Sequence, residues 1–138
     1  MKDVGYVVGL AFKTALVLAV LIIAAIYIWS DPIASIFNSE KNPELAAYAR
    51  EGIRLYFIGF LFAGINIVGT SALSAVEAVR WAFTASIMRG FVAILIFAFA
   101  LSAVFGMTGV WLAFPAAELV TMLLSLTGIS KSIWAKCR

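Results

Sequence analysis

The sequence predicts an all-α membrane protein with four transmembrane helices, and two observations carry that prediction. Hydrophobic residues make up 64% of the 138 positions and charged residues only 12%, which lies outside the usual range of soluble domains. The apolar residues also form charge-free runs, at 14–30, 55–76, 90–117 and 119–130. About 20 apolar residues cross a hydrocarbon core of roughly 30 Å. We therefore interpret residues 1–138 as one polytopic membrane segment.

The first two helices are expected at about 4–29 and 43–77. Proline cannot continue a helix and restricts the residue before it, so Pro32 predicts that the first helix stops near Trp29. That run is too long for a signal peptide, and no small-residue cleavage site follows it. The second helix is expected to begin at Asn42-Pro43-Glu44, which supplies a capping side chain, a first-turn proline and an acid near the positive end of the helix dipole.

The last two helices are expected at about 82–105 and 110–130, joined by a tight turn at Gly106–Gly109. Within the fourth helix, Pro115 removes the hydrogen bond to the carbonyl of Trp111. We therefore expect the fourth helix to bend at Pro115.

The distribution of Lys and Arg predicts the orientation of the spans. Seven of these residues fall on the side that carries both termini: Lys2, Lys13, Arg80, Arg89, Lys131, Lys136 and Arg138. The opposite side has Lys41, Arg50 and Arg54, accompanied by four acids. The expectation is a multi-pass protein of the cytoplasmic (inner) cell membrane, surrounded by lipid, with both termini in the cytoplasm.

Polar residues within the spans are the candidate functional residues, because a polar group in hydrocarbon must face protein or water. On the second helix such residues recur every three or four positions and include Asn66, Thr70 and Ser74. This stripe is either a close helix–helix seam, since small residues let backbones approach, or the wall of a water-filled substrate path.

The fourth helix carries a similar stripe that begins at Glu118 and continues through Thr121 and Ser125. Arg89 on the third helix lies about 6 Å from the depth of Glu118, judged from a rise of 1.5 Å per residue. The tight turn makes the two helices neighbours, so we expect Arg89 and Glu118 to pair or to share a polar network. The pair either locks the two helices together or contains a protonatable Glu118 that exchanges a coupling ion.

Catalytic chemistry has little support in this sequence. Histidine is absent and Cys137 is the one cysteine, so no metal site is expected. No nucleophile–base pair or phosphate-binding glycine loop is found. We expect no enzyme activity, no resident cofactor and no nucleic-acid partner.

Several segments in order resemble one family of transporters. FGMTGVWLAFPAAELVT, preceded by SIMRG and by GINIVGTSALSAVEA, is similar to the closing helices of multidrug and toxic compound extrusion (MATE) transporters. The segment IASIFNSEKNPELAAYAREGIRLYFIG is similar to the external connection before their tenth helix. The resemblance covers nearly the whole chain and implies that its spans match the last four of twelve helices, within one six-helix lobe.

The resemblance implies H⁺- or Na⁺-coupled multidrug efflux of cationic or amphipathic, drug-like compounds by alternating access. The implied partners of this antiporter fragment are the first lobe and the first two helices of the second lobe. Some family members place a coupling acid in the tenth helix, where this sequence offers only Asn66. We therefore expect the coupling-ion site to lie outside this chain, with Glu118 as a polar contact inside the lobe.

Two other interpretations remain open. A self-contained four-helix transporter acting as a dimer fits the length, as in the small multidrug resistance family. That family places its essential carboxylate in the first helix, however, where this chain has Lys13 and no acid beyond Asp3. A non-transporting membrane scaffold, with both polar stripes serving as packing seams, is the third possibility.

Overall fold

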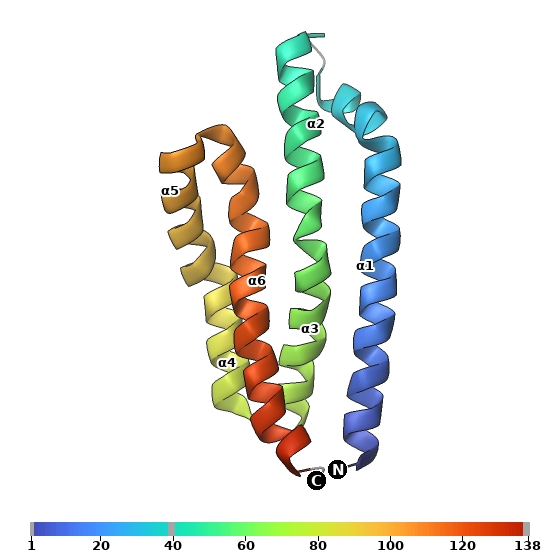
Figure 1. Cartoon of the computed structure of the whole chain (residues 1–138), viewed down its shortest axis with the longest axis vertical. Helices are drawn as coiled ribbons and strands as arrows, with labels where there is room; N and C mark the ends of the chain where they lie inside the picture. Colours follow the sequence, from blue (N-terminus) through green and yellow to red (C-terminus); the bar gives the residue numbers. More distant parts are fainter. Residues whose placement is uncertain (1, 39–40, 137–138) are drawn as a thin grey trace.

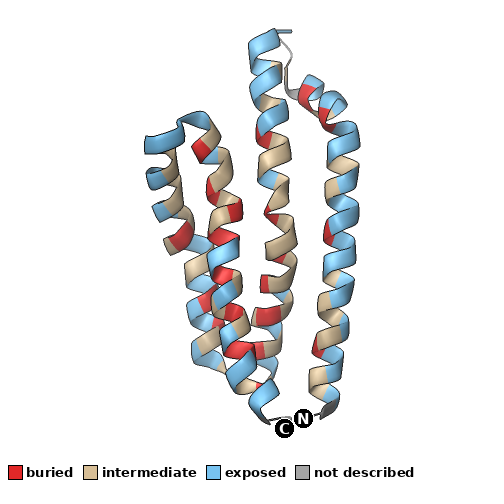
Figure 2. Cartoon of the chain, viewed as in Figure 1, coloured by how far each residue is buried: buried red, intermediate tan, exposed pale blue. Residues whose placement is uncertain are grey.

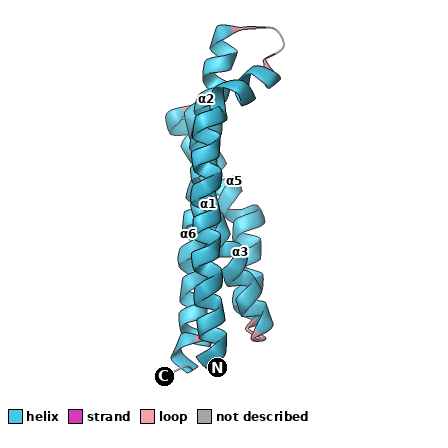
Figure 3. Cartoon of the chain, turned by 90° about the vertical axis from the view of Figure 1, so that its right-hand side faces the viewer, coloured by secondary structure: helices cyan, strands magenta, loops and turns pink. Residues whose placement is uncertain are grey.

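The computed structural model describes residues 2–38 and 41–136, and within those ranges the chain is helical with no strand (Figure 3). Cys137 and Arg138 lie outside the described residues. The elements in order are α1 (Lys2–Phe37), α2 (Pro43–Ile58), α3 (Phe60–Ala75), α4 (Val79–Ile87), the π-helix η1 (Met88–Val92), α5 (Ala93–Phe105), α6 (Met107–Ser132) and the 3₁₀ turn η2 (Trp134–Lys136).

These elements form four helical spans, which confirms the predicted fold class. The helices at Asp3–Ile36, Pro43–Ala75, Val79–Phe105 and Met107–Ser132 are each long and apolar enough to cross a membrane. The start of α1 and the end of α6 lie at the same end of the bundle (Figure 1), as four antiparallel spans require.

The predicted end of the first helix is wrong, because α1 continues through Pro32 to Phe37. A proline removes one backbone hydrogen bond and can bend a helix without ending it. Figure 1 shows the last turns of α1 leaning across toward the start of α2. This end of α1 is held to α2 by side chains, since Arg54 donates from Nε to the Ser30 hydroxyl at 3.1 Å and Arg50 pairs with Asp31.

The predicted second helix of 43–77 is interrupted at Gly59, which separates α2 from α3. Its start is as predicted, because the Asn42 side chain accepts hydrogen bonds from the backbone of Glu44 and Leu45. At this position the backbone lies close against α6. A Cβ atom at Gly59 would meet the ring of Phe114 and lie 3.1 Å from Cα of Pro115.

The end of this span is set by a backbone motif two residues earlier than predicted. Glu77 has a φ of 58°, its N–H donates to Ser74 and the N–H of Ala78 donates to Leu73. This is the Schellman pattern, in which a left-handed residue closes the helix and satisfies its last carbonyls. Glycine usually takes this position, and its absence here hid the stop signal in the sequence.

The third span begins at Val79 rather than near residue 82 and contains a feature that the sequence did not predict. Its helix changes to π-helical hydrogen bonding over Met88–Val92, around Arg89. The predicted turn at 106–109 reduces to Gly106, with φ 60° and ψ −132°, and α6 starts at Met107. Pro115 lies inside α6, which continues through it; the expected bend there stays a prediction.

The buried face of α6 is the centre of the molecule. It packs against α3 on one side and against α4, η1 and α5 on the other, and Figure 2 shows buried positions concentrated on these facing helices while α1 is largely exposed. Glycines permit the closest approaches. A Cβ at Gly109 would overlap the backbone of Leu101, and one at Gly128 would lie 3.0 Å from Cβ of Trp81.

Candidate functional site

The polar groups at mid-span meet in one buried network centred on Glu118. Arg89 Nε lies 2.8 Å from Glu118 Oε1, and the Glu118 side chain is 3% exposed. Asn66 Nδ2 donates to Glu118 Oε2 at 2.7 Å and to the Glu118 backbone carbonyl at 2.8 Å. The carboxylate is therefore bonded from two directions, by the third span and by α3. The predicted contact between Arg89 and Glu118 is present.

The remaining candidates either hydrogen-bond within their own helix or are exposed. The Thr70 hydroxyl donates to the Asn66 carbonyl at 2.8 Å, within its own helix. Thr121 is buried and likewise donates to its own helix, at the Ala117 carbonyl. Ser74 is exposed and lies outside the network. The role of these residues in a cavity or substrate path stays a prediction.

The predicted stripe on α6 is a packing seam along its length, whereas the stripe on α3 is one only as far as Asn66. On α3 the buried positions are Ala63, Asn66, Gly69 and Leu73, so the buried face leaves the predicted stripe after Asn66. On α6 the stripe from Glu118 through Ser125 is buried as a whole. A Cβ at Gly69 would lie 3.3 Å from Cβ of Ser125, which shows how closely the two helices approach.

A cavity of about 420 Å³ opens beside the Arg89–Glu118 pair. It is lined by Ser86, Arg89, Gly90, Ile94, Phe114 and Glu118. Sequence reasoning missed Phe114 as a member of this site. The signal was present, because Phe114 precedes Glu118 by four residues and therefore shares its helical face. The Phe114 ring stacks on Tyr56 with centroids 4.3 Å apart.

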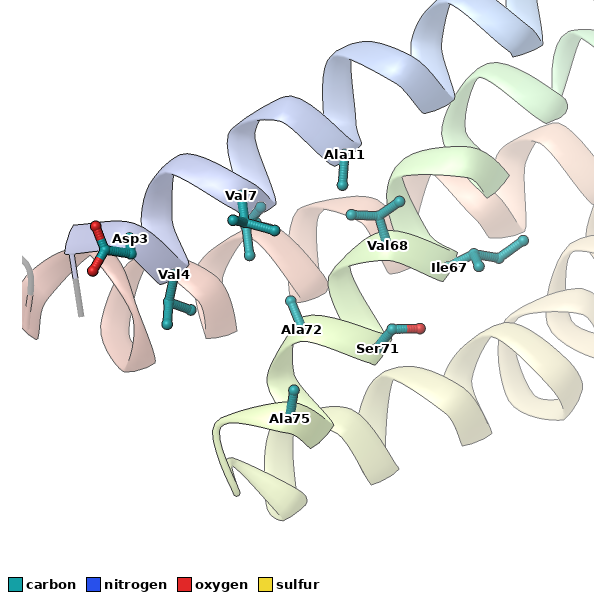
Figure 4. Close-up of a pocket in the computed structure, with 10 residues that line it drawn as sticks. Asp3, Val4, Val7, Ala11, Ile67, Val68, Ser71, Ala72 and Ala75 are labelled. Carbon is teal, nitrogen blue, oxygen red and sulfur yellow. The ribbon is translucent and has the colours of Figure 1, made fainter.

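A larger groove of about 550 Å³ lies between the first turns of α1 and the end of α3 (Figure 4). Its lining is apolar apart from Asp3 and Ser71, and the close-up shows Val7 and Ala11 of α1 facing Val68 of α3. None of the predicted site residues lines this groove. In a protein that spans a membrane, such an apolar groove suits a lipid chain or another helix.

Comparison with known families decides the assignment. The model of the MatE family matches residues 1–99. The chain belongs to the MatE family. No curated protein and no solved structure matches it. MatE proteins are secondary transporters rather than enzymes, so the four spans are those of a membrane transporter family.

The matched residues contain three of the segments that suggested the family, from IASIF through SIMRG. The fourth segment, around FPAAE in α6, lies beyond residue 99. The MatE match therefore covers Asn66 and Arg89 but not Glu118. The contacts of Asn66 and Arg89 with Glu118 are therefore observed in the structure and lie outside what the family match covers.

Proposed function

We propose that this MatE chain supplies four helices to an H⁺- or Na⁺-coupled antiporter, which exports cationic or amphipathic compounds by alternating access. The MatE match over residues 1–99 is the observation that carries the proposal. The spans would correspond to the last four of twelve helices. Their partners would be a first lobe and the first two helices of a second lobe.

The arrangement of the helices is consistent with a part of a lobe. One bundle of four spans cannot form both walls of a two-lobed cleft. The large apolar side chains along α1, such as Val17 and Leu21, are more than half exposed. In the proposed transporter this face of α1 meets either lipid or the helices that precede it.

The coupling ion is proposed to bind outside this chain. Asn66 is the polar residue at the middle of the second span, and its amide N–H₂ is already engaged by Glu118. Glu118 is in turn held by Arg89. The network is accordingly proposed to hold the lobe together while the other helices supply the ion site.

The test is ethidium efflux from cells that lack their own multidrug pumps. The chain alone should give no efflux, and co-expression with a polypeptide that supplies the remaining eight spans should give efflux that collapses with the H⁺ or Na⁺ gradient. No efflux from the combined polypeptides refutes the proposal. Efflux by the chain alone, together with a dimeric mass in detergent, would instead identify a self-contained dimeric transporter.

The proposed location is the cytoplasmic membrane, with both termini facing the cytoplasm. Cys137 is the one cysteine and provides a native probe near the C-terminus. A membrane-impermeant maleimide should label it only after the cells are permeabilised. Labelling of intact cells contradicts this orientation.

A further inference from the structure

Arg89 and Phe114 stand between two cavities in the middle of the bundle. Both residues line the 420 Å³ cavity beside Glu118, and both line a second cavity of about 320 Å³ between α1 and α3. The second cavity is otherwise apolar, with Phe60 and Ile67 among its lining residues. If the Arg89 side chain moved aside, the two spaces would join. The combined volume of the two cavities would fall within the roughly 300–1,000 Å³ of small-molecule sites.

Within the described residues, the Arg89 side chain makes one hydrogen bond, and this bond is also its ion pair with Glu118. Its Nε donates to Glu118, whereas its two terminal Nη groups donate to no group in the described part of the chain. The side chain is 32% exposed although Glu118 is only 3% exposed. The adjacent Gly90 has no atom within 4 Å of where its Cβ would lie. The arginine therefore has accessible donors, and the two cavities that it lines leave space beside its side chain.

The backbone around Arg89 supports a change of position. Residues Met88–Val92 form a π-helical turn, which holds one residue more than an α-helical turn and occurs often at functional sites. A return to α-helical bonding would rotate Arg89 relative to Glu118. The arginine head would then reach toward the headgroup region, as long basic side chains do.

We propose that Glu118 is a binding site for lipophilic organic cations, and that the Arg89 side chain competes with these ligands for the Glu118 carboxylate. When Arg89 swings aside, the ligand's positive charge takes its place at the Glu118 carboxylate. The apolar body of the ligand fills the joined cavities against Phe114 and Phe60. This inference rests on the proposed function and assigns cation recognition to these four helices.

Charge balance favours a cation over other ligands. A buried carboxylate left without a partner is strongly unfavourable, and the exchange of one cation for another never leaves Glu118 unpaired. An anion drawn to the Nη groups of Arg89 would lie against the Glu118 charge. The face of Phe114, backed by Tyr56, adds the attraction of an aromatic ring for an organic cation.

The competition makes one variant bind more tightly than the native chain. The probe is tetraphenylphosphonium, added to the purified chain in phosphatidylcholine nanodiscs and measured by equilibrium dialysis. Arg89→Gln removes the competitor, so the affinity should rise about tenfold or more, the factor that one charge-assisted hydrogen bond represents. Glu118→Gln should abolish saturable binding. Tetraphenylborate, which has the same shape and a negative charge, should not bind at this site.

Two matched variants control for the loss of charge. Arg54→Gln and Glu51→Gln make the same changes away from the site, where Arg54 bonds Ser30 and Glu51 accepts from Thr108. Both should bind the probe as the native chain does. Phe114→Leu should weaken binding of the phosphonium about threefold to tenfold, by loss of its cation–π contact, and it serves if Glu118→Gln does not fold.

Unchanged or weaker binding by Arg89→Gln overturns the inference, as does saturable binding by Glu118→Gln or Arg89-dependent binding of tetraphenylborate. Because nanodisc binding needs no transport, this result is separable from the efflux test. Retained competition without efflux by the combined polypeptides would refute only the transport proposal. Efflux without any phosphonium binding would refute only the present inference.

Discussion

Replacement of Asn66 by leucine tests whether the Glu118 network holds α3 to α6. Asn66 has no solvent exposure and donates two hydrogen bonds to Glu118, one to the carboxylate and one to the backbone carbonyl. Leucine is of similar size and removes both donors. The change therefore isolates the hydrogen bonds from the packing of the seam.

The expected loss in free energy of unfolding is about 1–3 kcal/mol. Two hydrogen bonds at the average of about 0.6 kcal/mol measured within membrane bundles give the lower value. A bond to a charged group is worth about 1.5–3 kcal/mol, which sets the upper value. Asn66 Oδ1 has no partner within the described residues, and its removal offsets part of the cost. The loss in free energy of unfolding should therefore be smaller than the summed contributions of the two hydrogen bonds that Asn66 donates.

The assay is unfolding of the chain by SDS in mixed micelles, followed by tryptophan fluorescence. Thr70→Val is the matched control, because the Thr70 hydroxyl bonds carbonyls of its own helix, and it should change stability by less than about 0.5 kcal/mol. In a Glu118→Leu background the effect of Asn66→Leu should be smaller, because only the hydrogen bond to the backbone carbonyl of residue 118 remains to be lost. The reasoning is refuted if Asn66→Leu costs no more than the control, or costs the same in both backgrounds.

Three further substitutions test separate features by the same unfolding measurement. Gly109→Ala should lower the free energy of unfolding by about 1–3 kcal/mol through overpacking against the Leu101 backbone. The control Gly9→Ala, with no atom near its Cβ, should be neutral or slightly stabilising. Equal effects of the two substitutions would contradict the close approach of α5 and α6. Gly106→Ala should cost about 1–3 kcal/mol through its positive φ alone, since no atom lies within 4 Å, and a neutral result would contradict the backbone strain. Arg50→Ala breaks an ion pair whose side chains are 47% and 59% exposed, so it should lower the free energy of unfolding by less than about 1 kcal/mol. A larger loss would contradict the small contribution expected of an exposed ion pair.

The spans and the Arg89–Glu118 contact were predictable because they depend on local rules. Apolar run length gives the spans, and the rise per residue with a short connection gives the depth match between adjacent helices. The bond from Asn66 to Glu118 joins helices that are not consecutive. Their relative register depends on how glycines at 59 and 69 let α3 approach α6, and no local pattern in the sequence specifies that distance.

The wrong boundaries have the opposite cause, since there the local rules were overridden. Pro32 is a helix breaker in isolation, but α1 continues past it and its end contacts α2 through Arg54 and Arg50. Glu77 takes the left-handed position that glycine normally occupies. The π-helical turn around Arg89 has no recognised sequence signature, so the room beside Arg89 was not foreseen.

The structural role and the proposed binding role of Arg89 make opposite demands, and this allows them to be separated. If Arg89 only fastens the third span to α6, then Arg89→Gln should lower stability and leave cation binding unchanged. If it also competes for Glu118, the same variant should lose stability and bind tetraphenylphosphonium more tightly. A ligand that opens the pair must supply from its own contacts the free energy that the pair had given to the fold. Bound phosphonium should therefore restore to Arg89→Gln the stability that it lost, and should stabilise the native chain less at the same concentration. Equal stabilisation of the native chain and Arg89→Gln by phosphonium would show that Arg89 has only the structural role of joining the third span to α6.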